Sequence, residues 1–260
     1  HDRAYSVRSQ KRLWLGLNGD AVQASVLWKH LAKYKPHWLV DVRAPEAFRG
    51  ATEPFIWNFW PSEGPDPTGD YEAIPALHWT DCFHTFADRP STKVAYALRW
   101  MFDIAAYDAS LGRYEVVPEA LTEKDRKLLP LVGVHFTGAS HPQRKNLPMK
   151  DRDDIRRCIA DLGAIPCGLE HYRGVGQLAW AINGCKAFVG IDSGPGKVAS
   201  ATETPSLICW IGHHPLRYHD PAPNTVHLIP DSHLDLPPLE IGKGSPKVMA
   251  DALGFFVHNY

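Results

Sequence analysis

The residues most clearly suited to chemistry form a tight polar turn, Asp192-Ser193-Gly194-Pro195-Gly196-Lys197. An apolar run at 187–191 precedes it and predicts a buried strand, and small residues at 198–202 follow it and predict a helix packed close behind. Such a helix N-terminus leaves backbone N–H groups unpaired, and these attract an anion together with the helix dipole. Lys197 is unfavourable there unless an anion lies between it and the dipole. The alternative is an ordinary strand-to-helix turn with Pro195 at the first helical position.

A second polar turn, Thr137-Gly138-Ala139-Ser140, follows the apolar run 129–136, which suits a buried parallel strand. Small hydroxyl-bearing residues and glycine directly after a strand indicate a phosphate cradle. Lys145 could reach into that cradle as a point charge. The alternative is a surface loop whose lysine is only solvated.

The first half of the chain offers a carboxylate in an equivalent place. Residues 13–17 predict a strand, residues 21–34 carry apolar side chains at helical spacing, and residues 38–42 predict another strand. This pattern opens a parallel α/β sheet, in which ligands gather beyond the carboxyl ends of the strands. Asp20 falls there. It is either the N-cap of its helix or a carboxylate that faces a cleft and accepts a proton.

The remaining elements complete two α/β halves of similar size. The patterns predict helices at 93–108, 151–162, 175–183 and 246–258, and strands at 164–168 and 205–212. Two such halves facing each other across a cleft would place Asp20 on one wall. Lys145 and Lys197, each with its anion-binding turn, would lie on the other.

Composition limits the partners and the compartment. The chain has 260 residues, a net charge of -1 and a pI of about 7.0, so it has no overall basic field for duplex nucleic acid or for an anionic membrane. Its five cysteines are scattered, without a zinc or redox spacing, which favours a reducing compartment. We find no signal peptide and no apolar run long enough to span a bilayer, so we predict a cytoplasmic protein. The sequence does not fix its oligomeric state.

Two further patterns are weak. The stretch 41–50 resembles the Asp-Val-Arg start of rhodanese domains, but Cys82 is followed by Phe-His-Thr-Phe and not by an anion-binding loop. We therefore interpret 41–50 as a strand end and a loop. His213, His214 and His219 lack a carboxylate or a helical His-Glu-x-x-His pattern, so we predict no metal site.

Taken in order, these motifs resemble those of glycosyltransferase family 9, the ADP-heptose:lipopolysaccharide heptosyltransferases and their relatives. The similarity covers roughly residues 12–42 and 129–220. The matching segments are Gly19-Asp20, Thr137-Gly138-Ala139-Ser140, Lys145-Asn146-Leu147-Pro148, Cys167-Gly168-Leu169-Glu170 and the run from Asp192 to Ser200. This sequence departs from the family pattern at Lys197, where the family has histidine, and at Leu147, where it has tryptophan.

The resemblance implies an α/β protein of GT-B fold, with two Rossmann-like lobes whose parallel sheets face a cleft. The implied division is an acceptor lobe at 11–125, a nucleotide-sugar lobe at 126–242 and a C-terminal helix at 243–260. It also implies an inverting, metal-independent transfer without a cofactor, with Asp20 as general base. Asp192 would contact the sugar hydroxyls and Glu170 the ribose. The remaining residues implied at the donor phosphates are Thr137, Gly138, Ser140, Lys145, Ser193, Gly194 and Lys197.

Several functions stay open within this interpretation. The donor would be a nucleotide sugar, and the acceptor a glycan, a lipid-linked sugar, a protein or a modified nucleobase. One alternative is a sugar-nucleotide epimerase of the same fold, which needs acid and base groups in the donor site itself. The other alternative is a binding module that has lost transfer activity.

Overall fold

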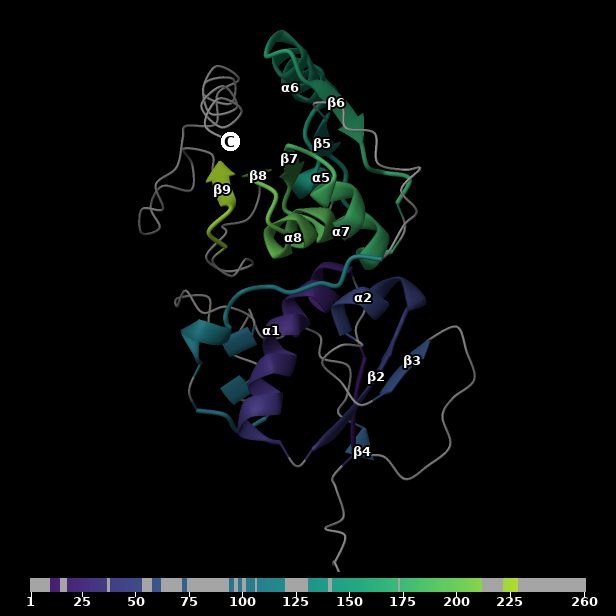
Figure 1. The fold of residues 1–260 in the computed structure, drawn as a ribbon, viewed down its shortest axis with the longest axis vertical. Coiled ribbons are helices and arrows are strands. Elements are labelled where there is room, and N and C mark those ends of the chain that lie inside the picture. The colour runs from purple at the N-terminus through teal and green to yellow at the C-terminus, as the bar shows by residue number, and fades with distance from the viewer. Residues whose placement is uncertain are drawn as a thin grey trace, which may run out of the picture.

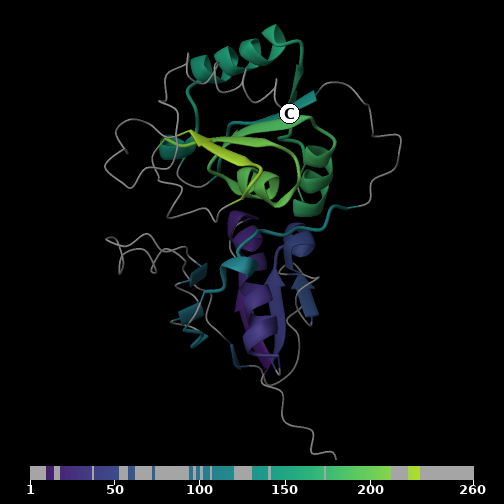
Figure 2. The same cartoon turned by 60° about the vertical axis from the view of Figure 1, so that its left-hand side comes forward.

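The computed structural model describes two parallel sheets, one in each half of the chain, with helices packed between and outside them (Figures 1 and 2). The described residues are 10–14, 18–36, 38–52, 58–61, 72–73, 94–95, 98–99, 102–105, 107–119, 131–139, 142–172, 174–211 and 222–228. None of the helices within these ranges is long and apolar enough to cross a bilayer.

The first sheet has four parallel strands in the order β3-β2-β1-β4. Their bounds are Gln10–Trp14 for β1, Leu39–Ala44 for β2, Asn58–Pro61 for β3 and Glu72–Ala73 for β4. Helix α1 (Asn18–Tyr34) connects β1 to β2 and buries Val22, Val26 and Leu31, which recur at helical spacing. From β1 the chain moves to β2 and β3 on one side and to β4 on the other, so the strand order reverses beside β1.

The second sheet has five parallel strands in the order β6-β5-β7-β8-β9. Its strand order reverses between β5 and β7, because the chain leaves β5 for β6 on one side and later pairs β7 on the other. The strands are β5 (Leu131–His135), β6 (Ile165–Gly168), β7 (Ala187–Ile191), β8 (Ser206–Cys209) and β9 (Thr225–Leu228). The helices are α5 (Pro142–Lys145), α6 (Met149–Asp161), α7 (Val175–Asn183) and α8 (Gly194–Ala201).

Helices cover the second sheet on both faces, as its apolar strands require. Ile155 and Ile159 of α6 pack in one apolar cluster with Val132 and Val134 of β5. Helices α7 and α8 cover the other face, between the second sheet and the first half (Figures 1 and 2). Strand β7 is buried at every residue, as its uninterrupted apolar run predicts.

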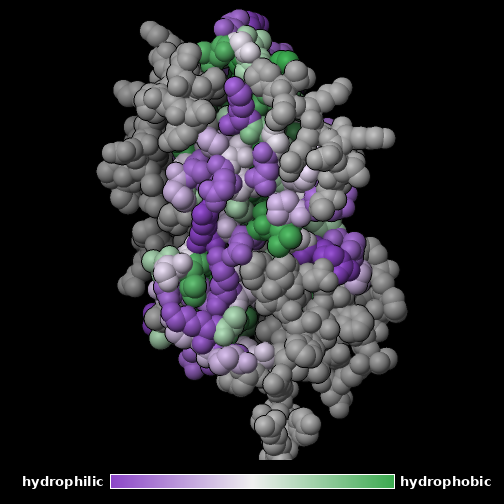
Figure 3. Space-filling view, in the orientation of Figure 1, coloured by the Kyte–Doolittle hydropathy of each residue, from purple (hydrophilic) through white to green (hydrophobic). Residues whose placement is uncertain are grey.

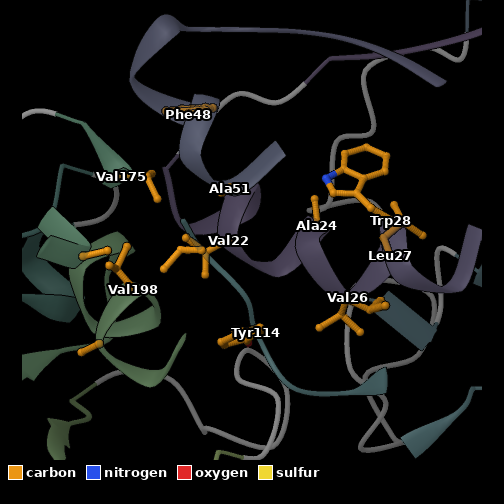
Figure 4. Packing of buried hydrophobic residues seen from close by; sticks show 14 of the residues in the cluster. Val22, Ala24, Val26, Leu27, Trp28, Phe48, Ala51, Tyr114, Val175 and Val198 are labelled. Atoms are coloured by element: carbon orange, nitrogen blue, oxygen red, sulfur yellow. The ribbon is translucent and has the colours of Figure 1, made fainter. Parts of the chain in front are cut away.

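The two halves are joined by direct helix packing. Helix α1 lies against α8, and the short helix α2 (Arg49–Thr52) lies against α7. Figure 4 shows Val22 and Ala51 of the first half and Val175 and Val198 of the second in one apolar cluster. On the face drawn in Figure 3, hydrophilic residues extend over both halves, with only small hydrophobic patches among the described residues. The cluster is therefore a shared interior.

The segment 107–119 runs along this junction and is bonded to both halves. The Val117 N–H donates to the Gly50 carbonyl at 2.8 Å, and the Glu119 N–H donates to the Gly176 carbonyl at 3.0 Å. Gly50 and Gly176 also allow a close approach of the two backbones. A Cβ on Gly50 would lie 2.9 Å from the Val117 carbonyl oxygen and 3.1 Å from the Gly176 nitrogen.

Several segments differ from the sequence-based prediction. The helix predicted at 93–108 does not reach its predicted end, because residues 102–105 and 107–108 are not helical and Asp103 has a φ of 51°. Strand β1 starts at Gln10, before the strand predicted at 13–17, because pairing with both β2 and β4 satisfies its backbone groups whatever its side chains are. The loop predicted before residue 50 contains a 3₁₀ turn (Glu46–Phe48) and α2, and an Arg49–Glu46 ion pair spans their junction. Strand β9 was not predicted, since it is a short edge strand with an exposed Val226.

Other predictions lie outside the described residues. These are the helix at 246–258 and with it the C-terminal segment 243–260, the boundary at 125/126 between the predicted lobes, and the histidines at 213, 214 and 219.

We predict that Gly50→Ala lowers the free energy of unfolding by about 1–3 kcal/mol, because the added methyl group meets backbone atoms that cannot rotate away. Gly174→Ala is the matched control at the same junction, since the nearest atom to its new Cβ would be 3.8 Å away. Urea unfolding of both variants measures the difference. Equal stability of the two variants would show that the halves do not depend on this close approach.

Candidate functional site

The two predicted polar turns meet at the carboxyl edge of the second sheet. One turn follows β5 and the other follows β7, and these neighbouring strands are paired up to His135 and Gly190. This is also the place where the strand order reverses, so the loops after β5 and β7 leave the sheet in opposite directions. The topology therefore places the candidate site where parallel α/β sheets bind ligands.

A buried carboxylate between two lysines is the centre of this site. The Asp192 Oδ1 atom lies 3.0 Å from the Lys197 Nζ, and the Asp192 Oδ2 lies 3.4 Å from the Lys145 Nζ. Their side chains are 4%, 7% and 15% exposed for Asp192, Lys197 and Lys145. A carboxylate this deeply buried needs counter-ions, and here each oxygen faces one. The three groups together carry one surplus positive charge.

Lys197 was predicted to face an anion near the start of its helix. The structure provides that anion from within the chain, because the Lys197 ammonium donates to Asp192. Its own N–H donates to the Ser193 carbonyl at 3.1 Å, within the first turn of α8. The lysine is thus tolerated at a helix N-terminus because an aspartate side chain neutralises it.

The turn after β7 is fixed by tight packing. Gly196 brings α8 close behind β7, since a Cβ there would lie 2.6 Å from the Ile191 carbonyl oxygen. Ser193 is the N-cap residue of α8, but its hydroxyl donates back to the Ile191 carbonyl at 3.2 Å and does not cap the helix. Pro195 has no N–H to offer. Ser193 and Gly194, whose amides are predicted to bind a phosphate, stand at this end of α8.

The turn after β5 is closed by Asn146. The Gly138 N–H, predicted to face a phosphate, donates to the Asn146 Oδ1 at 2.6 Å. The stem of Lys145 passes beside Gly138, within 3.9 Å of where a Cβ would stand. Thr137 is half-buried next to it, and Ser140 lies outside the described residues. A phosphate could reach the Gly138 amide only by displacing the Asn146 side chain.

Glu170 lies at the carboxyl end of the neighbouring strand β6. Its Oε2 atom would be 2.7 Å from a Cβ on Gly168, so the carboxylate folds back over the end of this strand. Beside it, His135 ends β5. Burial lowers the pKa of His135, and the charge of Glu170 opposes this effect.

The sequence analysis did not single out His135. One signal was available, because His135 is the only polar side chain in the apolar run 129–136.

Asp20 lies in the other half of the molecule. It is the third residue of α1, so the N-cap alternative is wrong, although an acid in the first turn still favours the helix dipole. Helix α1 follows β1, beside which the first sheet reverses its order, and packs against α8. The backbone of Asp20 thus belongs to the helix that joins the two halves.

Within the part of the chain that the structure describes, no three His, Cys, Asp or Glu side chains form a group that could hold a metal ion.

Comparison with known proteins identifies the fold. No family model and no curated protein matches the sequence. Among solved structures, a family 9 glycosyl transferase from Veillonella parvula DSM 2008 superposes with a TM-score of 0.67 at 14% identity, over 97% of this chain and 98% of that one. E. coli heptosyltransferase WaaC with ADP superposes with a TM-score of 0.60 at 10% identity, over 96% and 99%.

An iron-containing dodecameric glycosyltransferase, TibC from enterotoxigenic E. coli H10407, has the same fold, with a TM-score of 0.56 at 14% identity, over 97% of this chain and 75% of that one. At sequence identities of 10–14%, the structural similarity shows the fold alone. The prediction of an α/β protein with two Rossmann-like lobes, the GT-B architecture of family 9 enzymes, is confirmed.

We predict that Lys197→Met lowers the free energy of unfolding by about 3 kcal/mol, because it removes the closest counter-ion of a buried carboxylate. Lys145→Met, at the longer and more exposed contact, costs less. Adding Asp192→Asn to Lys197→Met removes the uncompensated charge and recovers part of the loss. Urea unfolding of these variants and of Asp192→Asn alone, all without ligand, measures this coupling. Additive effects of Asp192→Asn and Lys197→Met would show that the two side chains do not stabilise each other.

Proposed function

We propose that this chain is a glycosyltransferase that moves a sugar from a nucleoside-diphosphate donor to an acceptor hydroxyl. The second half would bind the donor and the first half the acceptor. The observation that supports this most is the pair of lysines around Asp192, at the carboxyl edge where the second sheet reverses its order. The fold, which family 9 glycosyltransferases share over nearly the whole chain, supports it independently.

The leaving diphosphate needs positive charge fixed in place before the reaction begins. Lys145 is suited to supply it, because it is the more exposed of the two lysines and holds the longer contact with Asp192. A phosphate could therefore take over part of its coordination while Lys197 keeps Asp192 paired. In this proposal the lysines neutralise the negative charge that develops on the leaving diphosphate, as a metal ion does in other transferases.

Asp20 would act as the general base that removes the proton from the acceptor hydroxyl. A single displacement by that hydroxyl, on the side of the sugar opposite the diphosphate, inverts the configuration at the transferred carbon. The similar structure of WaaC holds ADP, and another similar structure is the E. coli ADP-heptose LPS heptosyltransferase II, so an adenosine-diphosphate donor is the first one to test. The proposed acceptors remain a glycan, a lipid-linked sugar, a protein or a modified nucleobase, and the proposed compartment is the cytoplasm.

One observation favours a second function. His135 and Glu170 place two titratable groups in the donor half, which a sugar-nucleotide epimerase would need. Incubating the protein with a nucleotide sugar but no acceptor separates the two functions. An epimerase converts the sugar under these conditions, whereas a transferase leaves its configuration unchanged.

We predict that ADP raises the melting temperature in the presence of EDTA, since a ligand that binds only the folded state stabilises it by about 2.7 kcal/mol at a hundredfold excess over Kd.

Lys145→Met should weaken ADP binding by about 1–3 kcal/mol, the scale of a charge-assisted hydrogen bond, and leave adenosine binding unchanged. Thermal shift and calorimetry measure both effects. A shift that requires manganese would rule out the metal-independent site.

We predict that Asp20→Asn leaves donor affinity near the wild-type value and lowers the transfer rate about 10²–10⁴-fold, the usual cost of losing a general base. The melting temperature is the control, because asparagine keeps the size of the side chain. Transfer rate and donor affinity are measured on the same preparation. Wild-type turnover would move the base elsewhere, with Asp41, which lies in β2, and His78 as the next candidates.

A further inference from the structure

His135 is half-buried and lies on the face of the second sheet that α7 and α8 cover. Side chains alternate along a strand, and Val132 and Val134 belong to the apolar cluster under α6. Gly133 and His135 therefore face the opposite side, which α7 and α8 cover. Gly133 confirms this direction, because a Cβ there would meet Leu169 and neighbouring side chains of the shared interior.

The imidazole of His135 is incompletely bonded. Its Nδ1 atom is buried and has no hydrogen-bond partner among the described residues. Such an unpaired buried nitrogen is rare, because a buried polar atom without a hydrogen bond costs free energy that a hydrogen-bond partner would recover. Burial lowers the pKa of His135, while Glu170 and the residue's own carbonyl raise it. Burial thus favours the neutral form of the ring, which has one donor and one acceptor nitrogen.

Glu170 completes a polar pair at the same edge. Strands β5 and β6 are adjacent, with Val134 opposite Gly168, and the Glu170 carboxylate folds over the end of β6. The pair therefore lies on one side of the end of β5. The cluster around Asp192 lies on the other side, after β7. A neutral imidazole beside a carboxylate offers the hydrogen-bonding set that a sugar hydroxyl needs, one strand away from the charges that suit a phosphate.

We propose that His135 is a ligand-binding residue that hydrogen-bonds a sugar hydroxyl of the donor, next to Glu170. The proposal rests on the proposed donor function and adds a residue to it. The hydroxyl belongs either to the ribose of the nucleotide or to the transferred sugar. The two sources share this chemistry, and the choice of probe distinguishes them.

The experiment compares His135→Leu and His135→Gln with the wild type by calorimetry, using ADP, 2′-deoxy-ADP, ADP-glucose and pyrophosphate. We expect His135→Leu to weaken ADP or ADP-glucose binding about 3- to 10-fold, the value of one hydrogen bond, and pyrophosphate binding not at all. His135→Gln should recover part of the loss, because an amide can still bond a hydroxyl. His171→Leu, at the exposed residue after Glu170, is the matched control and should bind like the wild type.

Each outcome has one meaning. A loss seen with ADP assigns the contact to the ribose, and an unchanged 2′-deoxy-ADP affinity in the variant assigns it to the 2′-hydroxyl. A loss seen only with ADP-glucose assigns it to the transferred sugar. Wild-type affinity of a folded His135→Leu for all four probes would overturn the role of His135 and leave the donor site in place. Failure of the wild type to bind any of the probes would instead overturn the proposed function.

Discussion

The site depends on one buried charge. Asp192 follows a strand that is buried at every residue, and Gly196 holds the next helix so close that no water layer separates them. A carboxylate in this position is stable only if counter-ions lie in direct contact with it. They come from two separate elements, Lys197 of α8 and Lys145 of α5. The charge of Asp192 therefore links the two turns at the carboxyl edge of the second sheet.

Chain topology decides where this charge lies. Both sheets reverse their strand order, the first beside β1 and the second between β5 and β7. In each, the polar residues that the sequence singles out follow the carboxyl end of a strand at the reversal. Packing of α1 on α8 then brings the two edges into one molecule with a shared interior, which includes Val22 and Val198. The apolar junction thus fixes the position of the second sheet relative to the first.

Much of this arrangement was predictable. The apolar run of β7 and the helical spacing of α7 predicted the observed bounds, because both elements are strongly patterned. The pairing of Lys197 with Asp192 was not predictable, since two residues five apart meet only through the geometry of the turn between them. His135 was overlooked because a continuous apolar run does not reveal which residues alternate toward which face. The direction of the His135 side chain follows only once α6 is known to cover the face of the second sheet that Val132 and Val134 share.

The sequence resemblance to family 9 places Lys197 where that family has histidine, and this difference has a physical consequence for the site. A histidine partner titrates near neutral pH, so the charge beside the aspartate would change over the physiological range. Lys197 instead places an ammonium beside Asp192. With Lys197 3.0 Å from Asp192, that aspartate stays neutralised whatever happens at Lys145. Under the proposed function, Lys145 can then turn from the carboxylate to an incoming phosphate without leaving a bare charge in the interior, and the surplus positive charge of the cluster is available to the ligand.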